Sequence, residues 1–123
     1  MSEFTDRLGI KPGDSVVILD DGNTLFRRLS LEAPEDVALQ KRVLGDKVEM
    51  IIVRFGEKGD QKQLFRRIQR GLKPDGAIWS VTQASDTDFH AEMLQAANEA
   101  DLKETETVSF SEEEVGTRFV KSK

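Results

Sequence analysis

The chain has 123 residues, of which 37% are apolar and 33% charged, and its formal net charge is −5. Residues 1–123 suit one domain with a sizeable core, and their compact apolar runs exclude a disordered chain. The chain has no cysteine and a single histidine, which excludes disulfides, cysteine nucleophiles, thiolate metal sites and histidine metal clusters, so we expect no metal.

The first third of the chain predicts a strand, a helix and a short strand. Residues 15–20, "SVVILD", are an apolar run bounded by turn signals, which indicates a strand buried on both faces. Asn23 is placed to cap a helix that reaches at least Arg28 and ends at Ala33-Pro34. Residues 36–40, "DVALQ", predict a short, weak strand. The inner face of the helix would comprise Leu25, Phe26 and Leu29.

The middle third predicts two strong strands around an amphipathic helix. Residues 47–55, "KVEMIIVRF", are rich in the residues that favour strands. Residues 61–70 predict a helix with an apolar inner face and a basic outer face. Gly71 is placed to terminate this helix, and residues 74–76, "PDG", predict a turn. Residues 77–81, "AIWSV", predict another buried strand.

The last third predicts a helix and a hairpin. Ser85 and Asp88 resemble a capping box, and the helix after them would bury an apolar face. Residues 105–110 and 116–121 predict two strands whose connection is too short for a parallel crossover, so they form an antiparallel hairpin. The inner face of the helix would comprise Phe89, Met93, Leu94 and Ala97.

Strands that alternate with helices predict a mostly parallel sheet built from crossover units. We therefore predict the α/β class, with a three-layer Rossmann-like domain, a mostly parallel sheet and a C-terminal antiparallel hairpin. Residues 14–20 and 47–55 are expected to be adjacent parallel strands.

Charge is distributed unevenly along the chain. Residues 85–114 hold ten acids and one lysine, a balance of −9, whereas the other residues hold 17 bases and 13 acids, a balance of +4. This pattern is typical of solvated surfaces, but it also fits a bipolar surface that docks a protein partner or a second copy of the chain. A net-acidic chain argues against nucleic acid as a partner, although the basic residues 66–73 leave that alternative open.

The sequence also suggests where the chain resides. No apolar run approaches the roughly 18 residues of a membrane span. The N-terminal segment has acids where a secretory signal would have bases, and no apolar segment follows it. We expect a cytoplasmic protein that makes no contact with a membrane.

Three segments carry a resemblance to a known family. "LGIKPGDSVVILD" at 8–20, "LKPDGAIWSV" at 72–81 and "GTRFVK" at 116–121 resemble, in this order, the class I S-adenosylmethionine-dependent methyltransferase fold. The chain more closely resembles a small bacterial family of truncated, degenerate methyltransferase-like domains. The resemblance implies that one strand and one helix are missing between "VALQ" and "KVEMIIV". The matching motifs mark a fold and not a catalytic activity.

The resemblance also points to a candidate cofactor site after the first strand. In active methyltransferases this strand ends in an acid that is followed by three glycines at alternate positions. Here Asp20 matches the acid and Gly22 the first glycine, whereas Thr24 and Phe26 stand where the second and third glycines are expected. A phenylalanine at a position of close backbone approach conflicts with a bound cofactor, because its side chain fills the space.

The ends of two further strands complete the candidate site. The family places a ribose-binding acid at the end of the second strand, but here that strand ends in Gln40, Lys41 and Arg42. The bases Lys41 and Arg42 either favour a phosphorylated ribose or lie at an exposed strand end. Arg54 lies at the end of the strong strand, where it either binds an anion or is an ordinary strand-end residue.

Three functions follow from these observations. The first is a non-catalytic methyltransferase-like domain without a cofactor, which acts as a binding or protein-interaction module, alone or as a homo-oligomer. The second is a minimal S-adenosylmethionine- or nucleotide-binding enzyme, a methyltransferase, whose cofactor would lie against Asp20, Gly22, Asn23 and Arg54. The third is a nucleic-acid accessory protein that uses residues 66–73.

Overall fold

A computed structural model of the chain describes residues 3–19, 24–41, 47–54 and 61–121. These residues form a six-stranded sheet in the order β2-β1-β3-β4-β6-β5. The strands are β1 (Ser15–Leu19), β2 (Ala38–Gln40), β3 (Val48–Arg54), β4 (Leu72–Gln83), β5 (Leu102–Ser109) and β6 (Glu114–Lys121). The helices are α1 (Glu3–Leu8), α2 (Thr24–Glu32), α3 (Gln61–Ile68), the 3-10 turn η1 (Gln69–Gly71) and α4 (Thr87–Glu99).

The predicted topology is confirmed. β2, β1, β3 and β4 are parallel neighbours, and β1 pairs directly with β3 in a register that places Val16 opposite Met50 and Leu19 opposite Val53. β6 pairs antiparallel with both β4 and β5, as expected of the C-terminal hairpin. The fold is therefore a mostly parallel α/β sheet that ends in an antiparallel hairpin.

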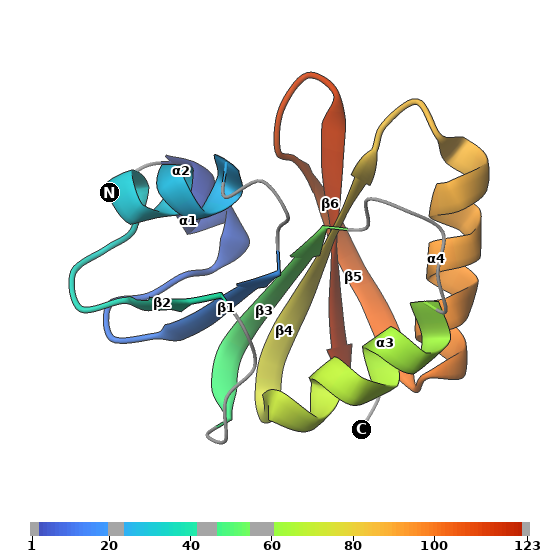
Figure 1. The fold of residues 1–123 in the computed structure, drawn as a ribbon, viewed down its shortest axis with the longest axis horizontal. Helices are drawn as coiled ribbons and strands as arrows, with labels where there is room; N and C mark the ends of the chain where they lie inside the picture. Colours follow the sequence, from blue (N-terminus) through green and yellow to red (C-terminus); the bar gives the residue numbers. More distant parts are fainter. Residues whose placement is uncertain (1–2, 20–23, 42–46, 55–60, 122–123) are drawn as a thin grey trace.

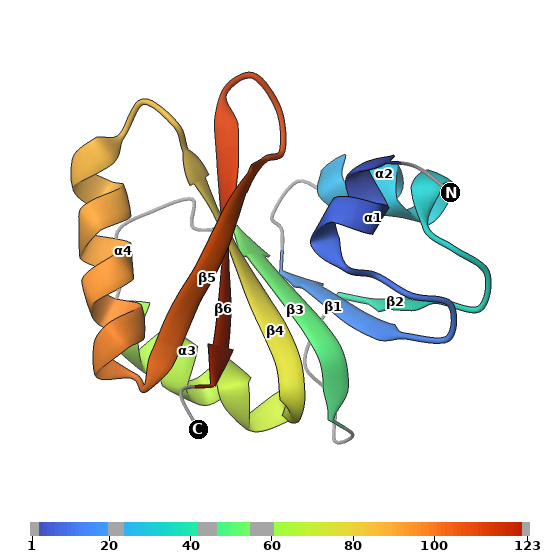
Figure 2. The same cartoon turned by 180° about the vertical axis from the view of Figure 1, so that it is seen from behind.

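Helices cover both faces of the sheet, which gives the three predicted layers (Figures 1 and 2). Because successive strand residues point to opposite faces, Val17 and Ile51 join one core while their neighbours Val16 and Met50 join the other. The first core packs against α3 and α4 through Phe65, Ile68, Met93 and Ala97. The second core packs against α1 and α2 through Phe4, Leu8, Leu25 and Leu29.

The expected end of the basic helix and the turn after it are wrong. Gly71 does not adopt a left-handed conformation, because η1 continues α3 and leads directly into β4. Residues 74–76 lie within β4 and do not reverse the chain. The register runs from Val48 opposite Leu72 to Met50 opposite Ala77, so four residues of β4 face one residue of β3. This bulge accommodates a proline, which lacks an amide donor for the ladder.

The N-terminus of α4 and the first helix also differ from expectation. The cap of α4 is Asp86, whose carboxylate accepts a hydrogen bond from the amide of Phe89 at 3.0 Å, and not Ser85. Asp86 and Ser85 are both good cap residues, and the sequence pattern favoured the wrong one. α1 was not predicted; it buries Phe4 and Leu8 against the sheet.

A cluster around Arg28 connects the helices of the second core to the C-terminal hairpin. The Arg28 guanidinium donates a hydrogen bond to the carbonyl of Phe110 at 2.6 Å and lies 3.6 Å from the centre of the Phe4 ring. The Phe110 ring packs edge-on against Phe4 at 5.0 Å and lies 5.9 Å from Trp79. The Trp79 indole in turn donates to the carbonyl of Leu8 at 3.1 Å. These contacts join α1, α2, β4 and the hairpin into one unit.

Candidate functional site

The candidate site lies at the carboxyl edge of the sheet, where open α/β sheets bind ligands. Asp20, Gly22 and Asn23 of the predicted cofactor site lie outside the described residues, as does Arg42. The described residues at this edge are the last residues of the strands, the start of α2 and the tip of the hairpin. They are sufficient to examine Phe26 and the three predicted strand-end residues.

Phe26 and Lys41 lie together. Phe26 is half-buried on α2 and packs against the second core. The ammonium of Lys41, which follows β2, lies 5.1 Å from the centre of the Phe26 ring, within the range of a cation–π contact. Two departures from the methyltransferase pattern, a ring at the third glycine position and a base at the ribose-acid position, are therefore in contact with each other.

Arg54 is paired within the chain. Its guanidinium lies 3.3 Å from the carboxylate of Glu114, the first residue of β6, and both side chains are largely buried. Because Arg54 aligns with Val81 and Glu114 aligns with Gln83, the pair crosses over β4. This partner lies 60 positions away in the sequence and could not have been predicted. The pair weakens the interpretation of Arg54 as an anion-binding residue, since its charge is already matched.

Gln40, the first of the predicted strand-end residues, has a feature that the sequence could not show. It is the last residue of β2, and its side-chain oxygen is buried without a hydrogen-bond partner. A buried acceptor without a partner is costly, so such atoms are often satisfied by water or by a ligand. Gln40 is thus the one described residue of the second strand end whose chemistry suits a hydroxyl donor such as a ribose.

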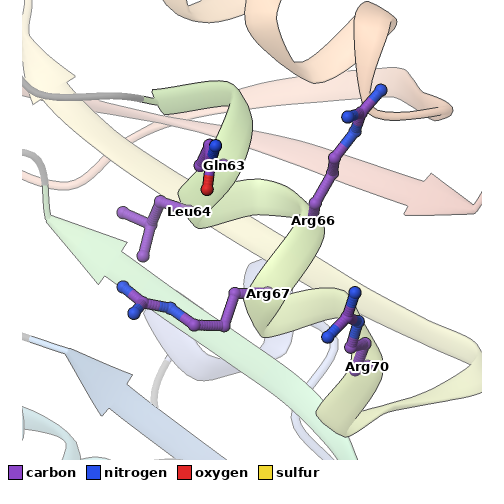
Figure 3. A pocket seen from close by; sticks show the side chains of 5 residues that line it. All are labelled: Gln63, Leu64, Arg66, Arg67 and Arg70. Carbon is purple, nitrogen blue, oxygen red and sulfur yellow. The ribbon is translucent and has the colours of Figure 1, made fainter.

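Away from the strand ends, a hollow lies over the exposed face of α3, and Figure 3 shows the side chains that line it. Leu64 and Arg67 extend to one side of the helix and Arg66 to the other. Among the described residues, no carboxylate lies within ion-pair distance of Arg66, Arg67 or Arg70. We call this hollow the basic groove; it is lined by Gln63, Leu64, Arg66, Arg67 and Arg70.

An ion pair with shifted pKa values lies at the opposite, amino edge of the sheet. The carboxylate of Glu49 contacts the ammonium of Lys73 and accepts a hydrogen bond from the amide of Ser15 at 2.6 Å. The bond from Lys73, assisted by that from Ser15, lowers the pKa of Glu49, and the same bond raises the pKa of Lys73. The pair closes the bulge of β4 over β3, so we interpret it as structural.

Solved structures show what the fold is similar to. A TehB-like S-adenosylmethionine-dependent methyltransferase from Corynebacterium glutamicum aligns with 94% of this chain and 84% of its own, at 12% identity and a TM-score of 0.57. The glycopeptide N-methyltransferase MtfA aligns with 97% and 88%, at 13% identity and a TM-score of 0.66. Fibrillarin from Aeropyrum pernix, described with natively bound S-adenosyl-L-methionine, aligns with 89% and 67%, at 11% identity and a TM-score of 0.60. No protein-family profile and no curated protein sequence matches the chain.

These similarities establish a methyltransferase-like, Rossmann-like fold. At such low identity they show the fold alone. MtfA is also described in complex with sinefungin, so the neighbours give no support to the expected absence of a cofactor. Within the described residues, acids and histidine form no group of three or more that could hold a metal ion. Across the same ranges, no helix is long and apolar enough to cross a membrane.

Proposed function

We propose that this chain is a non-catalytic domain with a methyltransferase-like fold, which acts as a cytoplasmic binding or protein-interaction module. It belongs, on this proposal, with the truncated and degenerate methyltransferase-like domains that its motifs resemble. The contact between Phe26 and Lys41 is the observation that carries the proposal.

The contact supports the proposal because it joins two positions at which the methyltransferase pattern has a glycine and an acid. A glycine at the position of Phe26 would let the backbone approach the cofactor, and an acid at the strand end would bind the ribose hydroxyls. The Phe26 ring instead packs on the second core, and Lys41 covers it. A ligand in the usual position would have to displace this pair and desolvate the lysine.

The spacing between β2 and β3 is also consistent with a shortened domain. Seven residues, 41–47, separate Gln40 from Val48. A crossover with its own helix needs about a dozen residues or more, so this interval cannot contain a further helix and strand. On the proposal, the helix and strand that the resemblance implies are missing would stand next to the second strand end, and their loss would reduce the surface available to a ligand at this edge.

A second candidate function is a minimal S-adenosylmethionine-binding enzyme, and Gln40 is the observation that favours it. Its buried, unpartnered oxygen lies at the strand end where the family binds the ribose. The ribose hydroxyls of S-adenosylmethionine would satisfy that acceptor. Asp20, Gly22 and Asn23 would line the rest of this site, on sequence grounds alone.

A titration distinguishes the two functions. The protein is titrated with S-adenosylmethionine and S-adenosylhomocysteine up to millimolar concentration, with ATP as a control, and followed by calorimetry and thermal unfolding. A ligand present at 100 times its dissociation constant would stabilise the fold by about 2.7 kcal/mol, which a melting curve of so small a domain resolves. We expect no stabilisation by either compound.

Two variants sharpen this experiment. If Phe26 and Lys41 close the site, Phe26→Gly combined with Lys41→Asp restores weak binding, while Gln40→Leu changes nothing. If the second candidate is right, the wild-type protein already binds and Gln40→Leu weakens that binding at least tenfold. Saturable stabilisation of the wild-type protein, abolished in Gln40→Leu, would overturn the proposal.

A further inference from the structure

Two oppositely charged surfaces lie at different ends of the molecule. The basic groove covers α3 and reaches Arg70, which lies in η1 two residues before β4. At the far end of β4, a second hollow is lined by Gln83, Ala84, Ser85, Glu112 and Glu113. Figure 1 shows the hairpin turn and the start of α4 at one end of the sheet and α3 toward the other.

The hairpin turn and the start of α4 together form the acidic end, which we call the acidic pole. The amide of Ala84 donates to the carbonyl of Glu113 at 2.8 Å and holds the hairpin turn against the start of α4. The backbone amides of Glu113 and Glu114 bond to the Ser111 hydroxyl, which leaves the exposed side chain of Glu113 outside these turn contacts. The exposed acids of the pole are Asp86, Asp88, Glu92, Glu112 and Glu113.

The two surfaces are too far apart to neutralise each other within one molecule. The regular part of β4 after the bulge, residues 77–83, alone spans roughly 20 Å at about 3.3 Å per residue, and Arg70 lies beyond the bulge. The Debye length is about 8 Å at an ionic strength of 0.15 M, so the two fields are screened from each other. Each surface therefore presents its charge outward to another molecule.

The basic groove also has a local reason to take up an acidic partner. Arg66 and Arg67 on α3 lie four and three residues before Arg70, which stands on η1, the continuation of α3, so like charges gather along the exposed face. Other bases nearby are matched: Lys62 pairs with Glu99 at 3.3 Å, and Lys73 pairs with Glu49. Carboxylates from a partner would offset these like charges and accept bidentate bonds from the guanidinium groups.

We infer that the basic groove of one molecule docks the acidic pole of a second copy of this chain. Each copy carries one basic groove and one acidic pole, so the two surfaces are always present in equal amounts. The contact is heterologous, because different surfaces meet, so it extends head to tail into a chain unless the geometry closes it into a ring. Complementary charge on the two surfaces sets the register and speeds association.

Charge reversal provides the test. Variant A carries Arg67→Glu and Arg70→Glu, and variant B carries Glu112→Arg and Glu113→Arg. All four side chains are exposed, so we expect both variants to fold. Sedimentation velocity at about 100 μM protein measures association in low salt, near 50 mM, and in high salt, near 500 mM, where charges are more strongly screened.

We expect the wild-type protein to associate in low salt and to dissociate in high salt. Variants A and B should each associate at least tenfold more weakly, because the groove of A has lost its net positive charge and the pole of B has lost most of its net negative charge. An equimolar mixture of A and B should regain association, since the unchanged pole of A fits the unchanged groove of B. Recovery in the mixture is a result that a mere folding defect in either variant cannot produce.

Matched controls distinguish the effect of reversing charges on the two surfaces from the effect of changing the net charge of the protein. Lys11→Glu with Arg27→Glu gives the same net charge as variant A, and Asp6→Arg with Glu35→Arg gives that of variant B; all four positions are exposed and lie outside both surfaces. Both controls should associate like the wild-type protein. A wild-type protein that is monomeric in low salt, or a mixture that stays monomeric, overturns the inference. So does a groove whose arginines instead bind a single-stranded oligonucleotide.

This inference rests on the proposed function only in treating the chain as an interaction module. Its readout is molecular mass, whereas the proposed function is tested by titration with S-adenosylmethionine. A monomeric protein that also fails to bind that compound would refute the homotypic contact and leave the proposed function in place. A protein that binds S-adenosylmethionine and self-associates would refute the proposed function and leave the homotypic contact in place.

Discussion

Replacement of Gly116 by alanine tests how tightly the hairpin is packed against the second core. A Cβ at this position would lie 2.7 Å from Cδ1 and 2.8 Å from Cζ of Phe110, closer than real Cβ atoms approach other carbons. The Phe110 ring cannot easily withdraw, because it is 4% exposed and contacts both Phe4 and Trp79. Its backbone is also held by Arg28. The added methyl group must therefore strain the core.

The expected cost lies between two limits. Overpacking a core by a methyl group costs about 1–3 kcal/mol, and complete loss of a buried phenylalanine costs about 3–5 kcal/mol. We expect Gly116→Ala to reduce the free energy of unfolding by about 2–3 kcal/mol. For a domain of this size that corresponds to a fall in Tm of roughly 10 °C.

The assay is urea unfolding followed by fluorescence of Trp79, which is the only tryptophan and is fully buried. The substitution is also made in a Phe110→Ala background, where the obstructing ring is absent. There we expect Gly116→Ala to be neutral or to stabilise by about 0.4–1 kcal/mol, because alanine restricts the unfolded chain. An equal cost in both backgrounds would refute the reasoning, since the cycle would then show no coupling between the two positions.

Two further predictions concern the polar contacts that join distant elements. Because the pKa of Glu49 lies below its ordinary value of 4.5, its ion pair with Lys73 stabilises the fold above that pH and is lost as the pH falls through the lowered pKa. Glu49→Gln should therefore flatten the acid side of the stability profile, measured by urea unfolding between about pH 3 and pH 6; an unchanged slope would contradict the assignment. Arg28→Met should lower the free energy of unfolding by about 1–2 kcal/mol, since it removes a charged hydrogen bond and a cation–π contact at a partly exposed site. Arg27→Met, at an exposed neighbouring position, should stay within about 0.5 kcal/mol of the wild-type protein, and equal losses in the two variants would count against the contact.

The topology could be predicted because the strands that define it are strongly patterned. β1 and β3 are short runs rich in buried β-branched residues, and the connections between strands leave few possible arrangements. The hairpin followed from the length of its connection. In contrast, α1 was missed because its six residues contain only two buried apolar side chains before a turn.

The bulge in β4 could not be predicted, because its causes are distant in sequence. The "PDG" segment has the composition of a turn, and local rules favour that interpretation. Yet a Cβ at Gly76 would lie 2.7 Å from the carbonyl oxygen of Glu49, so this glycine permits the two strands to approach each other. Lys73 reaches back to the same residue of β3. Tertiary contacts thus convert a turn-like sequence into a bulged strand.

Part of the candidate site could be predicted from the sequence. Phe26 and Lys41 were recognised as departures from the methyltransferase pattern, but their contact depends on the packing of α2 beside β2. The partner of Arg54 depends on the position of β6 next to β4. Asp20, Gly22 and Asn23 lie outside the described residues, so their roles stay predictions.

The hydrogen bond between Arg28 and Phe110 affects how the chain folds during its synthesis as well as how the folded structure is stabilised. It spans 82 positions, and the bond between Trp79 and Leu8 spans 71. The first two helices therefore cannot complete their core until Phe110 has left the ribosome, because part of that core is supplied by the hairpin. Long-range contacts of this kind slow folding, since the entropy of closing large loops is lost before the contacts form. The apolar faces of α1 and α2 thus stay exposed on the nascent chain until the hairpin has been synthesised.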